Sequence, residues 1–174
     1  MNTIAQYPLE FLFYLAGTIA IIASLKVVMG KNAVHSLLYL IVSLLAVAVC
    51  FYFMGAPFAA GLEVIVYAGA ILVLFVFAIM MFGLAEDEEK HSPKIKGLAI
   101  WIGPSSLAAL LLVELVYVIN SLSTGISTTI SHISAKQVGS LLYGPYLLAV
   151  EIASFLLLAG LVAGYHFAKP DSQG

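Results

Sequence analysis

The sequence predicts an all-α integral membrane protein with five transmembrane helices. Of its 174 residues, 63% are hydrophobic and only 9% are charged, whereas about a quarter of the residues in a soluble globular domain carry charge. Five apolar stretches also reach the roughly 20 residues that a helix needs to cross the hydrocarbon core of a bilayer. They are residues 9–29, 33–54, 59–83, 98–120 and 144–167. We therefore expect a single membrane domain over residues 1–174.

The connections between these stretches are consistent with that architecture. No Lys or Arg precedes the first stretch and "SLKVVMGKN" ends it, so we interpret it as a retained helix and not as a signal peptide. The turn "GAPFA" between the second and third stretches is so tight that those helices must be antiparallel neighbours. The loop "AEDEEKHSPKIKG" carries both signs of charge and is typical of a solvated connector. The Ser/Thr-rich outer loop 121–143 is longer than a turn requires, and we expect it to lie along the membrane surface or against another subunit.

The lysines predict the orientation, because loops rich in Lys and Arg stay on the cytoplasmic side. With five helices, six lysines fall on one side of the membrane and only Lys136 falls on the other. The N-terminus is therefore predicted outside and the C-terminus inside. The six lysines on the inner side are Lys26, Lys31, Lys90, Lys94, Lys96 and Lys169.

The composition excludes several functions. The chain has a formal net charge of −2 and no arginine, so it lacks the basic surface that binds nucleic acid. The single cysteine, Cys50, excludes an intrachain disulfide and offers no metal-ligand spacing. His35 and His166 are a conceivable haem pair, but both lie at helix ends, which argues against that use. With no phosphate-binding loop and no Ser/His/Asp set, we expect neither catalytic residues nor a metal on this chain.

Three carboxylates within the predicted spans are the candidate functional groups. They are Glu63, Glu114 and Glu151, and an acid at the centre of a transmembrane helix costs about 2.5–3.5 kcal/mol on insertion scales. All three lie in the outer half of the membrane in the predicted orientation, within about 10 Å of the outer end of their helix. Each is either a proton-carrying group or an acid that is simply hydrated or hydrogen-bonded near the interface. For Glu114 we favour the second interpretation, and for the other two both remain open.

The third apolar stretch combines an acid, a phenol and a glycine within one predicted helix. Glu63 and Tyr67 are four residues apart and share a helix face, while the sequence below them is apolar on every side, as in a helix buried in protein or lipid. Gly69 lies at the junction, where a missing side chain weakens a helix by about 1 kcal/mol in soluble hosts and lets a neighbouring backbone approach. On residues alone, Ala68-Gly69-Ala70 is equally well explained as a small-residue packing notch.

At this point the sequence resembles a known family. The segment "GLEVIVYAGAILVLFVFAIMM" at 61–81 is similar to the signature of subunit J of bacterial NADH:quinone oxidoreductase (respiratory complex I), the homologue of mitochondrial NADH dehydrogenase subunit six. Further similar stretches follow in order over nearly the whole chain. They are "HSLLYLIVSLLAVA" at 35–48, "WIGPS" at 101–105 and "ISAKQVGSLLYGPYLLAVEIASFLLLAGLVAGYH" at 133–166.

The resemblance implies a membrane-arm subunit of a proton-pumping complex in the bacterial inner membrane. It implies that FMN, iron-sulfur clusters and quinone belong to other subunits, with which this chain would assemble in the lipid bilayer. It also implies a π-bulge in the third helix around the positions of Tyr67 to Gly69. The family's acids match Glu63 and Glu151, whereas Glu114 departs from the family pattern, which puts a proton role for it in doubt.

We therefore interpret Tyr67-Ala68-Gly69 as a two-state hinge that gates a water path coupling quinone reduction to proton translocation. Loss of the bulge would rotate one side of the helix by about 100° and change which of Val73, Leu74 and Phe75 faces the subunit interior. Two other classes of function remain as alternatives. One is a subunit of a multi-subunit cation/proton antiporter, which would carry ions without NADH. The other is a structural scaffold, in which conservative changes at Glu63 and Tyr67 would be silent.

Overall fold

The architecture is all-helical throughout the part of the chain that the structure describes. The structure is a computed structural model that describes residues 3–30, 32–81, 97–123 and 133–168. Five helices within these ranges are long and apolar enough to cross a membrane, which confirms the predicted fold class. The five apolar spans are Glu10–Met29, Ala33–Phe53, Pro57–Met81, Trp101–Val118 and Leu147–Phe167.

The helical elements follow the order of the predicted spans, with one short addition before the last. The third span is one continuous helix made of an α piece, a π piece and a second α piece. The elements are α1 (Thr3–Met29), α2 (Ala33–Phe53), α3 (Pro57–Leu62), η1 (Glu63–Ile71), α4 (Leu72–Met81), α6 (Gly97–Ser123), α7 (Ala135–Leu142) and α8 (Leu147–Ala168). Together, α3, η1 and α4 are called the third helix below.

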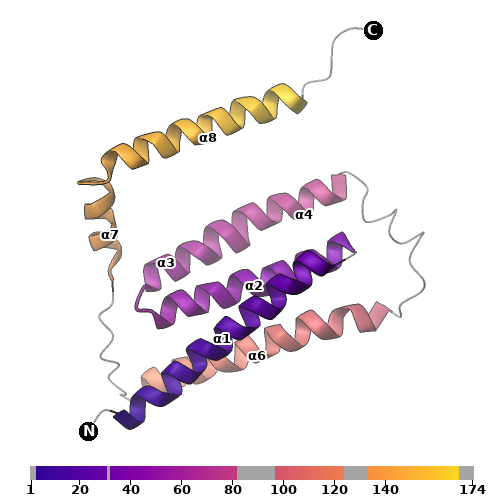
Figure 1. Ribbon diagram of the computed structural model, residues 1–174, viewed down its shortest axis with the longest axis vertical. Helices are drawn as coiled ribbons and strands as arrows, with labels where there is room; N and C mark the ends of the chain where they lie inside the picture. Colours follow the sequence, from indigo (N-terminus) through magenta and orange to yellow (C-terminus); the bar gives the residue numbers. More distant parts are fainter. Residues whose placement is uncertain (1–2, 31, 82–96, 124–132, 169–174) are drawn as a thin grey trace. The chain divides into compact units, whose positions relative to one another are not determined.

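The chain divides into two compact units, Met1–His132 and Ile133–Gly174. In the first unit α2 is the central helix, since it contacts α1, all three pieces of the third helix and α6. The third helix and α6 lie on opposite sides of α2 (Figure 1). The third helix begins where α6 ends along this bundle, because successive helices alternate in direction.

Short local signals start and stop α2. The side chain of Asn32 accepts a hydrogen bond of 2.8 Å from the backbone N–H of His35, which caps the first turn. The helix ends at Phe53, and Gly55 follows in the turn with a positive φ of 81°, which suits glycine. Pro57 then occupies the first turn of the third helix, where its missing N–H is harmless. The predicted tight turn between these antiparallel helices is therefore built around Gly55 and Pro57.

The core of the first unit is a seam between α1, α2 and α6, called the α1–α2–α6 seam below. Its buried members are Ile19, Ala23, Tyr39, Val42, Ala46 and Leu111. Small residues let transmembrane helices approach closely, which increases van der Waals contact where apolar lipid gives no hydrophobic driving force. Ala23 and Ala46 accordingly have no exposed surface, and the Ser43 hydroxyl donates a hydrogen bond of 3.2 Å to the Ala20 carbonyl across α1 and α2.

Glycine also brings α6 against α2. A Cβ atom placed on Gly103 would collide with the hydroxyl of Tyr39, and Tyr39 is buried in the seam. The next residue, Pro104, lies inside α6 and is itself buried. The contact therefore depends on the absence of a side chain at Gly103.

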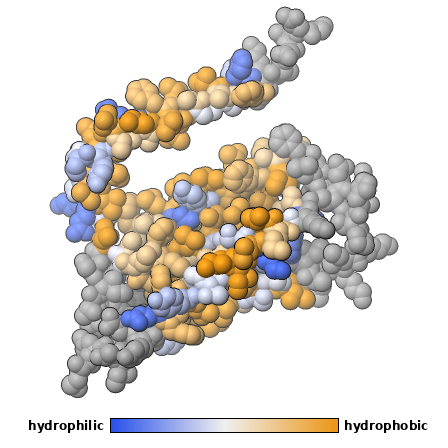
Figure 2. Space-filling model, in the orientation of Figure 1, coloured by the Kyte–Doolittle hydropathy of each residue, from blue (hydrophilic) through white to orange (hydrophobic). Residues whose placement is uncertain are grey.

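The second unit consists of α7 and α8. A capping box starts α7, in which the Ser134 side chain accepts from the backbone N–H of Gln137 and the Gln137 side chain accepts from that of Ser134. None of the residues of α8 from Leu147 to Phe167 is buried within its own unit, and Figure 2 shows apolar residues along its visible face. The second unit by itself therefore does not bury the apolar surface of α8.

Part of the sequence interpretation falls outside the described residues. Of the seven lysines, only Lys26 and Lys136 lie within the described ranges, so the orientation of the termini remains a prediction. Within the predicted outer loop 121–143, α6 continues to Ser123 and α7 begins at Ala135, while residues 124–132 are outside the described part.

Candidate functional site

The third helix leaves α-helical geometry at the predicted position. Residues Glu63–Ile71 form a π-helix of nine residues, which confirms the expected π segment. The expected bulge covered Tyr67 to Gly69, so the observed segment is longer and includes Glu63 as well as Tyr67. Runs of π-helix are rare and occur frequently at functional sites. The acid, the phenol and the glycine therefore share one irregular segment.

The hydrogen bonds and close contacts of the segment explain the glycine. At its C-terminal end the backbone N–H of Leu72 bonds to the carbonyls of Gly69 and of Tyr67, five residues earlier. A Cβ atom on Gly69 would lie 3.2 Å from the carbonyl oxygen of Val64, also five residues earlier. Such a contact is tighter than side chains usually make. Glycine at this position therefore removes a steric obstacle to the wider π turn.

One face of the third helix packs on α2. Leu72 is its buried residue, with 3% of its surface exposed. Ala68 and Gly69 before it, and Val76 and Ile79 after it, are half-buried, which is the spacing of one helix face. Leu72 was not among the predicted site residues, because its neighbours in the sequence are just as apolar.

The predicted wall residues lie elsewhere on the helix. Val73, Leu74 and Phe75 are each at least half exposed, and Tyr67 is 51% exposed. None of them faces the interior of the first unit in the observed π state. A water path along this wall would therefore lie at the surface of that unit.

The three acids are in three different environments. Glu63 is half-buried at the start of η1, and Glu151 is exposed near the start of α8. Glu151 offers its backbone carbonyl to the Ser154 hydroxyl at 2.7 Å. Glu151 belongs to the second unit, whereas Glu63 and Glu114 belong to the first.

Glu114 is the buried acid. Only 3% of its surface is exposed, and neither carboxyl oxygen has a hydrogen-bond partner. It shares the inward face of α6 with buried Leu111 and Val118. This burial without a partner differs from the hydrated or hydrogen-bonded environment that the sequence favours. No local signal distinguishes it, since the residues around it are apolar on all sides of α6.

The histidines and cysteine do not assemble into a recognisable centre in the described ranges. No group of three or more His, Cys, Asp or Glu residues gathers there in a way that could hold a metal ion. The His35 ring packs edge-on against Tyr39 with centroids 4.9 Å apart, and His166 lies near Phe167 at 6.1 Å. His35 and His166 belong to different units, and each contacts an aromatic neighbour on its own helix.

Comparisons with known proteins relate the chain to one group. The model of the family described as NADH-ubiquinone/plastoquinone oxidoreductase chain 6 matches residues 8–167. The protein named NADH-quinone oxidoreductase subunit J from Pseudomonas aeruginosa is 51% identical over 165 residues, which covers 95% of this chain and 99% of that protein. The protein of the same name from Escherichia coli K12 is 51% identical over 167 residues, covering 95% and 90%. Its namesake from Buchnera aphidicola subsp. Schizaphis graminum is 47% identical over 161 residues, covering 92% and 98%.

Proposed function

Because the chain belongs to the NADH-ubiquinone/plastoquinone oxidoreductase chain 6 family, we propose that its third helix gates proton translocation in an NADH:quinone oxidoreductase. The observation that carries this proposal is the nine-residue π-helix that holds Glu63, Tyr67 and Gly69 together. The chain is a subunit of the oxidoreductase complex with helices able to span a membrane. In this proposal it resides in the bacterial inner membrane and contacts other membrane-arm subunits.

The gate would work through helical register. If the π segment converts to α-helix, its hydrogen-bond ladder loses one extra residue and the helix beyond it turns by about 100°. Each residue then takes the angular position that its successor held before. Ile71 would replace Leu72 against α2, and Phe75 would replace Val76. A large aromatic ring would therefore move from the exposed wall into the contact with α2.

The polar end of the third helix would supply the protons. Glu63 and Tyr67 both lie in η1, so a change in its winding alters their relation to each other and to the apolar wall. Bulky apolar side chains beside a narrow path exclude water, and their withdrawal admits it. In the proposed mechanism this chain moves water and protons only, while FMN, iron-sulfur clusters and quinone belong to other subunits.

The test compares two glycines of the same helix in assembled, membrane-reconstituted complexes. Gly69→Ala and Gly69→Leu place a side chain against the Val64 carbonyl, whereas a Cβ on Gly61 meets no atom within 4 Å. We expect the Gly69 variants to lower the number of protons pumped per NADH oxidised, more strongly for Leu than for Ala. Gly61→Ala and Gly61→Leu should keep the normal ratio. Proton uptake and NADH-driven quinone reduction are measured on equal amounts of complex.

Specific outcomes would contradict the gate. If the Gly69 variants pump normally once corrected for lower assembly, Ala68 and Gly69 are only a packing notch against α2. Unchanged pumping in Glu63→Gln and Tyr67→Phe would support a structural scaffold. Cation flux in vesicles without NADH, abolished by the same substitutions, would instead support an antiporter subunit.

A further inference from the structure

A second proton site follows from the surroundings of Glu114, on the side of α2 that faces away from the third helix. An ionised carboxylate that is taken out of water and left unpaired is strongly unfavourable, so such a group is normally neutralised. Only 3% of the surface of Glu114 is exposed, and neither of its carboxyl oxygens has a hydrogen-bond partner.

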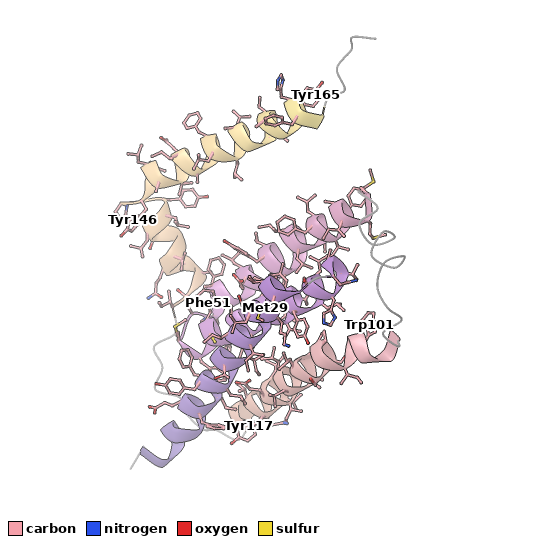
Figure 3. All side chains as sticks on the ribbon, turned by 45° about the vertical axis from the view of Figure 1, so that its right-hand side comes forward. Met29, Phe51, Trp101, Tyr117, Tyr146 and Tyr165 are labelled. Carbon is pink, nitrogen blue, oxygen red and sulfur yellow. The ribbon has the colours of Figure 1, made fainter. Side chains whose placement is uncertain are left out.

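The position of Glu114 is defined by the register of two parallel helices. Gly103 meets the hydroxyl of Tyr39 at one level of the contact between α6 and α2. Eleven residues further along each helix are Glu114 and Cys50, and these two groups are close enough to interact electrostatically. Figure 3 shows Tyr117 at the end of α6 away from Trp101. Glu114 therefore lies toward the α2–α3 turn, opposite Cys50.

The titratable groups that face this position are few. On α2 it is the Cys50 thiol, which is uncharged in its usual form and is half-buried. On α1, which runs antiparallel to α2, the buried residues toward this end of the helix are Leu12 and Ala16, which do not titrate. On α6 itself the inward neighbours Leu111 and Val118 are apolar. A basic partner that would hold Glu114 as a carboxylate is thus lacking among the described residues around it.

We propose that Glu114 is an exchangeable proton-binding site, carried as a neutral carboxylic acid in the contact between α2 and α6. It lies four residues, or about 6 Å, before the end of the apolar span at Val118. Its proton therefore exchanges with the membrane surface near the α2–α3 turn. This is the same end at which the third helix carries Glu63. The proposal is independent of the π-helix gate, because it depends only on the burial of Glu114.

The test is infrared spectroscopy of the purified, assembled oxidoreductase at neutral pH. The wild-type spectrum minus that of Glu114→Gln should contain the carbonyl band of one protonated carboxylic acid per chain. Glu10→Gln, at an exposed carboxylate near the end of the α1 span, is the matched control and should remove a carboxylate band. After NADH-driven turnover in D₂O, the Glu114 band should shift because its proton has been exchanged.

Three outcomes would overturn the proposal. The first is a carboxylate band, in place of a carboxylic acid band, in the Glu114 difference spectrum. The second is a carboxylic acid band that does not shift after turnover in D₂O, because that proton is locked in. If Glu114→Gln does not assemble, Glu114→Met replaces it in the comparison. The third is loss of the complex with both variants while Glu114→Asp assembles, if the wild-type spectrum minus that of Glu114→Asp shows only carboxylate bands, since the acid at this position would then be ionised.

Discussion

The α1–α2–α6 seam and the third helix are similarly apolar in sequence, yet they use that property differently. The seam buries its residues within the chain, and its alanines and Gly103 bring the helices into close contact. The third helix turns only one face to α2 and leaves Tyr67, Val73, Leu74 and Phe75 exposed. The first unit thus buries the seam by itself, whereas it leaves most of the third helix uncovered.

The same contrast separates the two acids of the first unit. Glu114 is enclosed by the seam and has no hydrogen-bond partner, whereas Glu63 is half-buried in the π segment of the third helix. In the two proposals above, Glu114 holds a proton within a packed contact, whereas Glu63 passes protons on along a helix that changes its winding. The proposed roles of the two acids therefore follow from what their helices pack against.

The largest expected effect concerns which membrane surface both acids approach. On a Cys50→Ala background, Met54→Cys at the α2–α3 turn should react with a membrane-impermeant thiol reagent in intact cells. Met29→Cys lies at the C-terminal end of α1, on the opposite side of the membrane from the α2–α3 turn, and should react only after permeabilisation. Both methionines are exposed. The opposite labelling pattern would reverse the predicted orientation and move both acids to the cytoplasmic half.

A side chain at Gly103 should damage the seam. Gly103→Ala places a methyl group against the buried Tyr39 hydroxyl, and overpacking a core typically costs about 1–3 kcal/mol. We expect less assembled complex and a lower dissociation temperature, both largely restored by adding Tyr39→Phe. Gly17→Ala, where a Cβ meets nothing within 4 Å, is the control. Failure of Tyr39→Phe to restore assembly would show that the contact is not the cause.

Phe75 and Leu74 distinguish a switching wall from a static one. Both side chains are at least half exposed in the π state, so a static wall predicts similar small effects of Phe75→Ala and Leu74→Ala. In the proposed register change, Phe75 would move into the contact with α2 and Leu74 would not. We therefore expect Phe75→Ala to reduce pumped protons per NADH severalfold more than Leu74→Ala does, at equal assembly. Equal ratios in the two variants would argue for a static wall.

The smallest effect is expected at the polar contact within the seam. Ser43→Ala removes the hydroxyl that bonds to the Ala20 carbonyl at 3.2 Å, and such interhelical bonds average about 0.6 kcal/mol in a membrane protein. The dissociation temperature should fall slightly while activity per complex stays unchanged. A large loss would mean that the α1–α2 contact depends on this bond more than on its alanines.

Composition and the lengths of the apolar runs were enough to predict the five helices, because a bilayer admits only helices or closed barrels with fully bonded backbones. The resemblance of the third helix to a known signature located the π segment near Tyr67 and Gly69, although its full extent from Glu63 to Ile71 was not foreseen. The helices and the π segment depend on the order of residues along a single helix, so they can be predicted without knowing what surrounds that helix.

Which faces of those helices are buried depends on how the helices pack against one another. Leu72 and Val73 are adjacent apolar residues, and only packing on α2 buries the first and leaves the second exposed. Glu114 lies among apolar neighbours on α6, so its sequence could not show that the seam would remove it from water. Hydropathy measures how a residue partitions between water and an apolar phase, and that phase is lipid or protein according to contacts between distant parts of the chain.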